Sequence, residues 1–304
     1  MTYTVTSRTR VTRLAALSLV VLALPTTAAA ASADPAEALQ QRYTALQEQL
    51  AHNEYQRPLY LDSTDADGST RGEAYVVVQH PFKRVVAALG SADHWCDILI
   101  LHVNTKYCRP AVGAPGNSVL QVAMGRKFEQ DLDDAYQVDF SYRKLHSDDK
   151  LLQVELDAAS GPMGTRDYRI QLEAVPLTVE QSFIHLSYAY SYGVSARLAM
   201  QAYLATMGSS KVGFTVVSRN AAGEPEYIEG VRGAVERNTL RYSLAIEAYL
   251  GAWSAAPDQR TEKRLRDWFA ATERHPLQLH EMELDEYLAM KRNEIRRQEE
   301  PIAK

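Results

Sequence analysis

The sequence predicts an α+β fold, in which an antiparallel sheet of about seven strands wraps around one long helix. Seven segments between Gly72 and Ser218 alternate apolar and polar residues, as half-buried strands do. A two-faced helix is predicted to follow over 229–251. Shorter predicted helices interrupt the strands after the first and after the sixth. A sheet with one apolar face, covered by a helix, encloses an interior. That interior is either a packed hydrophobic core or a cavity that holds an apolar ligand.

Period-two alternation defines each predicted strand. The strands span 72–79, 119–124, 137–144, 150–157, 167–175, 181–192 and 211–218. In the third, Val138, Phe140 and Tyr142 share one face, and Asp139 and Arg143 lie on the other. Alternation of this kind is typical of an antiparallel sheet with one buried face. The same rule turns Val212, Phe214 and Val216 inward in the last segment.

Helical spacing defines the connecting elements. Helices are predicted over 82–89, 93–101 and 194–207. In the long helix one stripe carries Val231, Val235, Asn238, Tyr242, Ile246 and Tyr249, and Leu240, Leu244 and Ala248 lie roughly opposite. A helix with two apolar sides packs against other elements on both of them. We expect the sheet on one side and the C-terminal tail (261–271 and 277–298) on the other.

The first 33 residues have the design of a secretory signal peptide. Arg8, Arg10 and Arg13 precede an apolar stretch over 14–24, and Ala31-Ser32-Ala33 forms a small-x-small cleavage site. An uncleaved membrane anchor is the alternative, but the stretch is shorter than the roughly 20 residues that span a bilayer. No cysteine follows it, so lipoprotein processing is not supported. The expected location is periplasmic or secreted.

Removal of the predicted signal peptide changes the length and the formal charge of the chain. Removing 33 of 304 residues leaves 271, and losing three arginines takes the formal charge from −5 to −8. This charge argues against a nucleic-acid partner, which needs a basic face. Four segments are expected: the signal peptide 1–33, an N-terminal helix and loop over 34–70, a ligand-binding domain over 71–251 and a helical extension over 252–304. Asp34 and Pro35 begin the N-terminal helix, and 62–70 is predicted to be a loop.

The chain contains two cysteines, Cys96 and Cys108. Export places them in an oxidising compartment, so a disulfide is the first interpretation. The alternatives are free thiols or a metal site with His94 and His102. The order H-x-C-x5-H-x5-C matches no standard zinc spacing, so no metal is expected.

The order strand, two helices, six strands and a long helix resembles the helix-grip layout of the START-like superfamily. That superfamily includes lipid-transfer START domains, polyketide cyclases and plant ligand-binding relatives. The segments that carry the resemblance are GEAYVVVQHPFKRVVAAL (72–89), GPMGTRDYRIQLEAVPL (161–177), SFIHLSYAYSYG (182–193) and GVRGAVERNTLRYSLAIEAYL (230–250). It implies a cavity between sheet and closing helix that holds a lipid, sterol, polyketide or other apolar ligand.

Candidate ligand-binding residues lie on the predicted inner face. Five tyrosines share it, namely Tyr142, Tyr168, Tyr188, Tyr190 and Tyr192. An ordinary core uses Phe, Leu and Val, whereas tyrosine suits a cavity that grips an apolar body and orients a polar group. The alternative is that these hydroxyls reach the rim of the sheet or bond the closing helix.

The closing helix adds Asn238, Arg241 and Tyr242 to the candidate site. Asn238 interrupts an apolar stripe, either to orient a ligand or to bond a neighbouring tyrosine. Arg241 lies near the stripe's edge, where its planar fork could hold a carboxylate or phosphate; a surface ion pair is the alternative.

No catalytic motif occurs, since G-x-S-x-G, H-E-x-x-H, P-loop and Rossmann patterns are absent from the sequence. We therefore expect no cofactor, and a protein that binds an apolar small molecule or lipid, with transient membrane contact left open. An enzyme of the cyclase or hydrolase kind is the second hypothesis. A packed, ligand-free envelope protein with a protein partner is the third.

Overall fold

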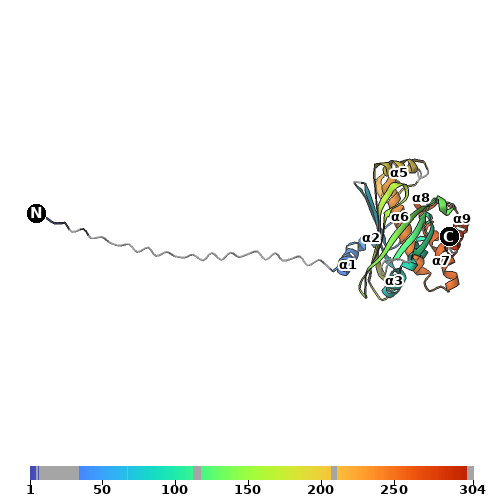
Figure 1. Cartoon of the computed structure of the whole chain (residues 1–304), viewed down its shortest axis with the longest axis horizontal. Coiled ribbons are helices and arrows are strands. Elements are labelled where there is room, and N and C mark those ends of the chain that lie inside the picture. Colours follow the sequence, from blue (N-terminus) through green and yellow to red (C-terminus); the bar gives the residue numbers. More distant parts are fainter. Residues whose placement is uncertain (5, 7–33, 67, 112–117, 207–210, 300–304) are drawn as a thin grey trace. The chain divides into compact units, whose positions relative to one another are not determined.

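The computed structural model describes residues 1–4, 6, 34–66, 68–111, 118–206 and 211–299, without the side chains of 203–206. Residues 34–304 form one compact unit, separate from residues 1–33 (Figure 1). The predicted signal peptide and its cleavage site lie outside the described residues. In the described ranges, no helix is both long and apolar enough to cross a membrane.

One large antiparallel sheet dominates the described part of residues 34–299. Its eight strands, in spatial order, are β1 (Leu59–Ala66), β2 (Ser69–Val78), β8 (Ser182–Tyr192), β7 (Thr165–Pro176), β6 (Leu152–Ser160), β5 (Tyr136–Ser147), β4 (Ser118–Met124) and β3 (Thr105–Ala111). Helices α3 (Phe82–Leu89) and α4 (Ala92–Leu99) lie between β2 and β3 in the chain, and α5 (Val194–Thr206) follows β8. Strands β2 to β8 with α6 (Gly230–Gly251) make an α+β helix-grip fold, as the sequence predicts.

Strand β3 belongs to the sheet but was not among the predicted strands. This strand was not predicted, because Thr105, Lys106, Tyr107 and Cys108 are all buried and show no alternation. Helix α4 packs on β3, and helix α9 (Leu284–Glu299) packs on it as well. A strand that helices bury from more than one side loses the period-two signal that identified the others.

The predicted strand over 211–218 was wrong. Only 216–219 is extended there, as β9 (Val216–Arg219) in a separate hairpin with β10 (Pro225–Tyr227), and Val216 is exposed. The backbone N–H groups of Phe214 and Thr215 donate to Glu236 Oε2 of α6, at 2.6 and 3.0 Å. A buried carboxylate on the closing helix thus satisfies donors that a sheet would otherwise use.

The predicted loop over 62–70 was also wrong, because residues 62–66 belong to β1 and residues 69–70 belong to β2. Leu59, Leu61 and Ser63 pair with Val76, Ala74 and Gly72 and so share the inner face with them. The polar composition of 62–70 hid this strand. Ser63 is buried because its hydroxyl donates to Glu236 on α6.

Helix α6 lies against the inner face of β1, β2 and β8. Gly72 makes the close approach possible, because a Cβ there would lie 2.2 Å from Thr239 Oγ1. The opposite side of α6 packs on α7 (Pro257–Thr272), and the Trp268 indole donates to Arg241 O at 3.0 Å. The prediction that the long helix is buried between sheet and tail is confirmed.

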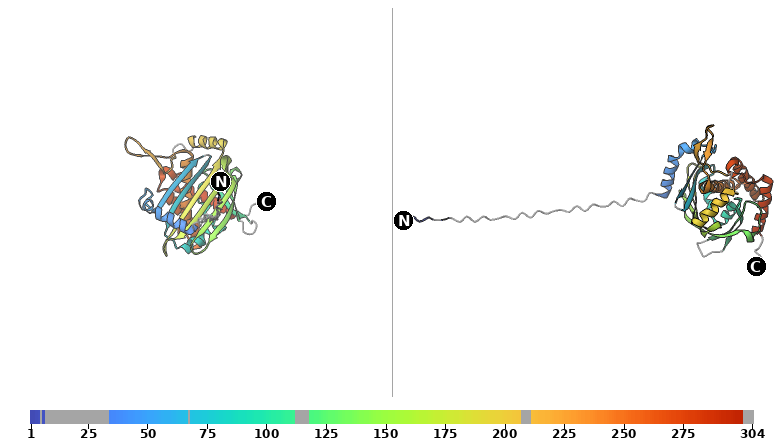
Figure 2. Two further views of the ribbon diagram at one scale, coloured as in Figure 1. Left: turned by 90° about the vertical axis from the view of Figure 1, so that its left-hand side faces the viewer. Right: turned by 90° about the horizontal axis from the view of Figure 1, so that it is seen from above.

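Helix α1 (Pro35–Ala45) covers the outer face of the sheet, on the side away from α6 (Figures 1 and 2). Asp34 Oδ1 accepts from Ala36 N at 3.0 Å and caps the helix, as its sequence predicts. With α2 (Gln47–Ala51), α1 forms a second apolar cluster against the outer-face residues Tyr75, Val175 and Phe183.

The C-terminal extension is fastened to β3 by fully buried charges. Glu294 of α9 accepts from Lys106 Nζ of β3 at 3.0 Å and from Lys291 Nζ at 2.7 Å. Lys291 also donates to the carbonyls of His102 and Thr105, at 2.6 and 2.8 Å. We call Lys106, Lys291 and Glu294 the buried clasp. It holds α9 over an edge strand whose backbone groups would otherwise be unpaired.

The disulfide prediction is confirmed. Cys96 of α4 and Cys108 of β3 are bonded, with Cα atoms 5.1 Å apart. The bond fastens the inner helix to the strand that carries the buried clasp. Among the described residues, no group of His, Cys, Asp or Glu side chains has the arrangement of a metal site.

Candidate functional site

Four tyrosines meet on the inner face between β7, β8 and α6. The ring of Tyr168 stacks on Tyr190 at 5.2 Å between centroids, and Tyr188 lies 5.3 Å from Tyr242 and 5.7 Å from Tyr190. We call Tyr168, Tyr188, Tyr190 and Tyr242 the tyrosine cluster. The strands supply three of them because successive inward positions of β7 and β8 fall two residues apart.

Burial keeps the tyrosine cluster neutral. It raises the pKa of Tyr188, Tyr190 and Tyr242 far above the ordinary value near 10. The Tyr168 hydroxyl lies 2.7 Å from Thr165 Oγ1 and has a bonding partner. Tyr168, Tyr190 and Tyr242 each keep 6 % exposure, whereas the neighbouring Leu172 and Leu186 keep 0 and 1 %. Tyr188 keeps 3 %, so all four tyrosines of the cluster are buried.

Two of the predicted ligand-binding tyrosines lie outside the tyrosine cluster, at its margins. Tyr192 donates its hydroxyl to Asp65 of β1, and burial together with this bond raises its pKa to about 12. Tyr142 lies on β5, and its hydroxyl is 3.5 Å from Leu89 O at the end of α3. Both are buried, but these contacts satisfy their hydroxyls within the protein.

Asn238 lies next to His102, which the sequence analysis considered only as a ligand of the alternative metal site. His102 stacks on Tyr242 at 4.9 Å, and the Asn238 amide lies beside its imidazole. Asn104 N donates to His102 Nδ1 at 3.1 Å, which assigns the ring proton to Nε2. Burial, followed by the charges of Arg241 and Lys291, holds the pKa of His102 well below its ordinary value, so the imidazole is neutral.

Arg241 is buried at 2 % exposure and is not a surface residue. It pairs with Glu281, from the connection between α8 (Pro276–Leu279) and α9, and lies 3.3 Å from Leu279 O. Lys127, just beyond β4, donates to the same Glu281 oxygen at 2.7 Å. The predicted surface pair is thus an internal one, made with the C-terminal extension.

Two further cations lie close enough to Lys127 and Arg241 to interact with them electrostatically. Lys211 donates to His280 O, and Arg237 of α6 donates to Val212 O at 3.0 Å. We call Lys127, Lys211, Arg237 and Arg241 the cation cluster. Burial, together with the charges of Arg241 and Arg237, lowers the pKa of Lys127 to about 8 in spite of the opposing effect of Glu281. Sequence analysis missed all of these except Arg241, because they come from separate segments with no common spacing.

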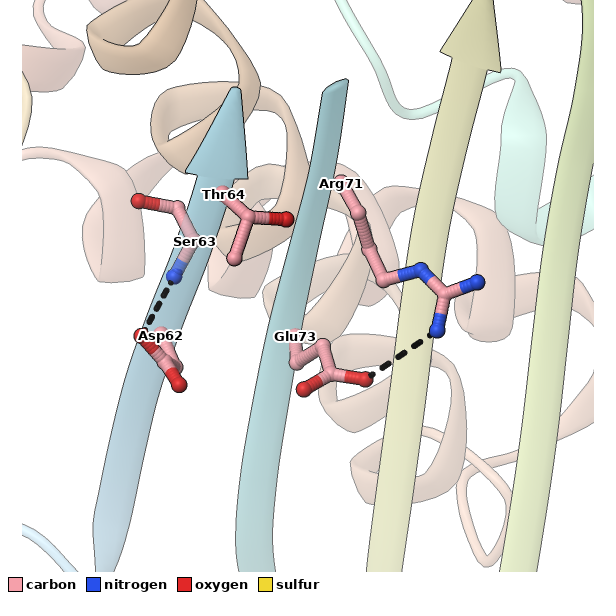
Figure 3. Close-up of a pocket in the computed structure, with 5 residues that line it drawn as sticks. All are labelled: Asp62, Ser63, Thr64, Arg71 and Glu73. Atoms are coloured by element: carbon pink, nitrogen blue, oxygen red, sulfur yellow. Dashed lines mark hydrogen bonds and ion pairs between the residues drawn. The ribbon is translucent and has the colours of Figure 1, made fainter. Parts of the chain in front are cut away.

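Two pockets lined by described residues both lie away from the tyrosine cluster. The larger, of about 240 Å³, lies over β1 and β2 and is lined by Asp62, Ser63, Thr64, Arg71 and Glu73 (Figure 3). Arg71 Nη1 lies 3.8 Å from Glu73 Oε1 across it. By register, Asp62 and Glu73 belong to the outer face. The smaller pocket lies among the tail helices and includes Trp268, Leu279 and Glu281.

The most polar histidine environment is also on the outer face. His185 lies 3.1 Å from Glu173 and 3.6 Å from Glu73, and stacks on Tyr75 at 4.4 Å. Although burial alone lowers the pKa of His185, bonds to the two glutamates raise it above the ordinary value. The sheet separates this group from the tyrosine cluster, so the two do not form one acid–base site.

Comparisons with known proteins define similarity in fold. No protein-family model and no curated protein matches the chain. Similar solved structures include a norcoclaurine synthase point mutant from Thalictrum flavum, which is 14 % identical in sequence. The match covers 50 % of this chain and 91 % of that chain, and its TM-score is 0.32. A STAR-related lipid transfer protein from Xanthomonas axonopodis has 12 % identity, coverages of 49 and 91 % and a TM-score of 0.32. Human StAR-related lipid transfer protein 5 has 6 % identity, coverages of 56 and 89 % and a TM-score of 0.30. Likeness of this degree carries no information about the ligand of this chain.

The buried cations predict an unusual dependence of stability on pH. Burial lowers the pKa of both Lys127 and Lys291 to about 8, whereas an unfolded lysine titrates near 10.4. Between these values the unfolded chain binds more protons, so the free energy of unfolding rises with pH, by at most about 1.4 kcal/mol per pH unit for each lysine. Above pH 10 the buried tyrosines reverse the trend, because only unfolded tyrosine ionises there.

Urea unfolding of residues 34–304 between pH 7.5 and 11 checks this prediction. We expect the highest stability near pH 9.5 to 10. Lys291→Met should flatten the rise, and Lys263→Met, which removes a half-exposed lysine, should not. A wild-type curve that stays level from pH 7.5 to 10 would contradict the lowered lysine pKa values.

Proposed function

We propose that this protein is exported and binds an apolar small molecule or lipid between its sheet and α6, without chemistry. The tyrosine cluster carries the proposal. Its rings are buried and contact one another between strands β7 and β8 and helix α6. Aromatic rings with hydroxyl groups suit a site that surrounds an apolar body and orients its polar end. The disulfide supports an oxidising location.

The sequence-based site residues form two groups under this proposal. Tyr168, Tyr188, Tyr190 and Tyr242 would contact the apolar body, with Tyr142 and Tyr192 at its margins. Asn238 bonds to His102, and Arg241 pairs with Glu281 of the C-terminal extension. They would face the polar end of a ligand. An enzyme using the same site is the second hypothesis, and neutral His102 is the group that an acid–base role would require.

The direct experiment is mass spectrometry of whatever co-purifies with the mature chain. Binding is then measured with N-phenyl-1-naphthylamine, an uncharged apolar probe whose fluorescence rises in an apolar site. Saturable binding at one site per molecule supports the proposal. If nothing co-purifies and the probe does not bind, the ligand-free hypothesis replaces it.

Tyr188→Leu should weaken probe binding more than it weakens the fold. The substitution keeps an apolar side chain but removes a ring that touches Tyr190 and Tyr242. Losing one aromatic contact is worth about 0.5–1.5 kcal/mol, which predicts a 2- to 10-fold increase in the dissociation constant per folded molecule.

Tyr75→Leu is the matched control, because Tyr75 is an equally buried ring on the outer face of the same sheet. It should lower the melting temperature and leave probe affinity unchanged. If Tyr188→Leu lowers the melting temperature by many degrees and binding per folded molecule stays the same, Tyr188 belongs to the packed core.

A further inference from the structure

The tyrosine cluster is closed in this structure, so a ligand reaches it only if part of its cover moves. Its four rings are buried, and the two pockets that described residues line both lie elsewhere. Helices lie at both ends of the sheet (Figure 1). Helix α3 follows β2 at Val78, whereas α5 follows β8 at Tyr192. These are opposite ends, because Val78 pairs with Ser182 at the start of β8.

The cover at the α5 end is the more weakly held of the two. Helix α3 buries four side chains and α4 buries five, and the disulfide fastens α4 to β3. Among the described side chains of α5, over 194–202, Ala196 is buried and Met200 is partly buried, and the others are exposed. Val194 and Leu198 are 79 and 62 % exposed although they are apolar. An element that buries little apolar surface opens locally at a low free energy.

Helix α5 rests on the connection from β6 into β7, residues 161–167, which we call the β6–β7 turn. Met163 and Asp167 have φ angles of 57° and 54°, in the left-handed region that residues with a Cβ rarely adopt. Gly164 faces α5, because a Cβ on it would lie 3.7 Å from the Cβ of Ala196. Strained backbone of this kind clusters in segments that clamp ligands or switch between conformations.

The same turn holds Tyr168 of the tyrosine cluster. The step from Arg166 to Arg169 takes three residues of β7 and only two of β8, so β7 has a bulge there. The bulge lets Thr165 and Tyr168 both be buried, where strict alternation would place them on opposite faces. Their hydroxyl oxygens lie 2.7 Å apart, and a Cβ on Gly161 would come within 2.3 Å of the Tyr168 ring. A movement of the turn therefore moves Tyr168.

We propose that α5 and the β6–β7 turn form a gate, which opens to admit an apolar ligand to the tyrosine cluster. When α5 lifts from Gly164, the turn loses its cover and the Tyr168 ring is free to leave its stack on Tyr190. The gate rests on the proposed function, because only a protein that binds a ligand there needs an entrance. The weak burial of α5 and the backbone of the turn do not depend on a ligand, so opening can also be measured without one.

A disulfide across the gate tests the route of entry. Gly164→Cys with Ala196→Cys should form a bond, because the Cβ separation of 3.7 Å matches the mean of about 3.8 Å for disulfides. The matched control is Gly164→Ser with Ala196→Ser, which makes the same changes in size without the bond. The locked protein should take up N-phenyl-1-naphthylamine at least about tenfold more slowly than this control, since lid opening then limits entry.

Hydrogen exchange of the wild-type protein without ligand is the second measurement, and it needs no variant. Amides of 194–202 and of the β6–β7 turn should exchange faster than those of α3 and α4. The engineered disulfide should slow both segments together. Equal uptake rates for the locked and control proteins, or protection of α5 as strong as that of α3, would overturn the gate. If the probe binds to none of these proteins, the proposed function itself fails and the gate fails with it.

Discussion

Glu294→Gln should be among the most destabilising single substitutions in the chain, at about 3–5 kcal/mol. The change keeps the shape of the side chain but leaves the ammonium groups of Lys106 and Lys291 buried without a counter-charge. All three side chains are fully buried, so water cannot compensate. Helix α9 should detach from β3 or the whole domain should unfold. Urea unfolding measures the loss, and limited proteolysis within 284–299 distinguishes the two outcomes.

Glu262→Gln is the control for the clasp. Glu262 also pairs with α9, through Arg292 at 2.7 Å, but both groups are substantially exposed. Exposed pairs of this kind contribute about 0–1 kcal/mol. If the two substitutions cost the same, the buried clasp does not hold the extension in place.

Removal of the disulfide should cost about 3 kcal/mol, the value that chain entropy gives for a loop of this size. Cys96 and Cys108 are 12 residues apart and fasten α4 to β3. The variant with both cysteines replaced by alanine should lose as much stability as the reduced wild-type chain. Its Gln298 contact with Cys108 N should weaken too, since α9 rests on the strand that the bond positions.

Thiol titration provides the check on the bond itself. Protein purified and denatured without reductant should show no reactive thiol. Two reactive thiols would contradict the disulfide. Equal urea midpoints for the oxidised and reduced chains would contradict its contribution to stability.

The direction of the inward side chains could be predicted from the sequence, whereas the contacts of the candidate site could not. The inward direction of Tyr142, Tyr168, Tyr188, Tyr190 and Tyr192 was predictable, because one period-two rule applies along each strand. Their role in ligand binding stays a prediction. The contact of Arg241 with Glu281 was not predictable, because it joins α6 to a residue 40 positions later. No local spacing encodes such a pair.

The sequence by itself determined the elements that carry their own pattern: six alternating strands, helix α3 to the residue and α6 within one residue, and the Cys96–Cys108 bond. Only the tertiary structure decided that β1 and β3 join the sheet and that 211–218 leaves it. The reason is that contacts with distant segments, and not local spacing, decide how these residues are buried. Helices α4 and α9 both pack on β3 and bury four successive residues of it, so it shows no alternation. Glu236 satisfied the backbone that a seventh alternating strand would have paired. The cation cluster likewise exists only after folding, because charge is balanced in space between segments that the chain keeps apart.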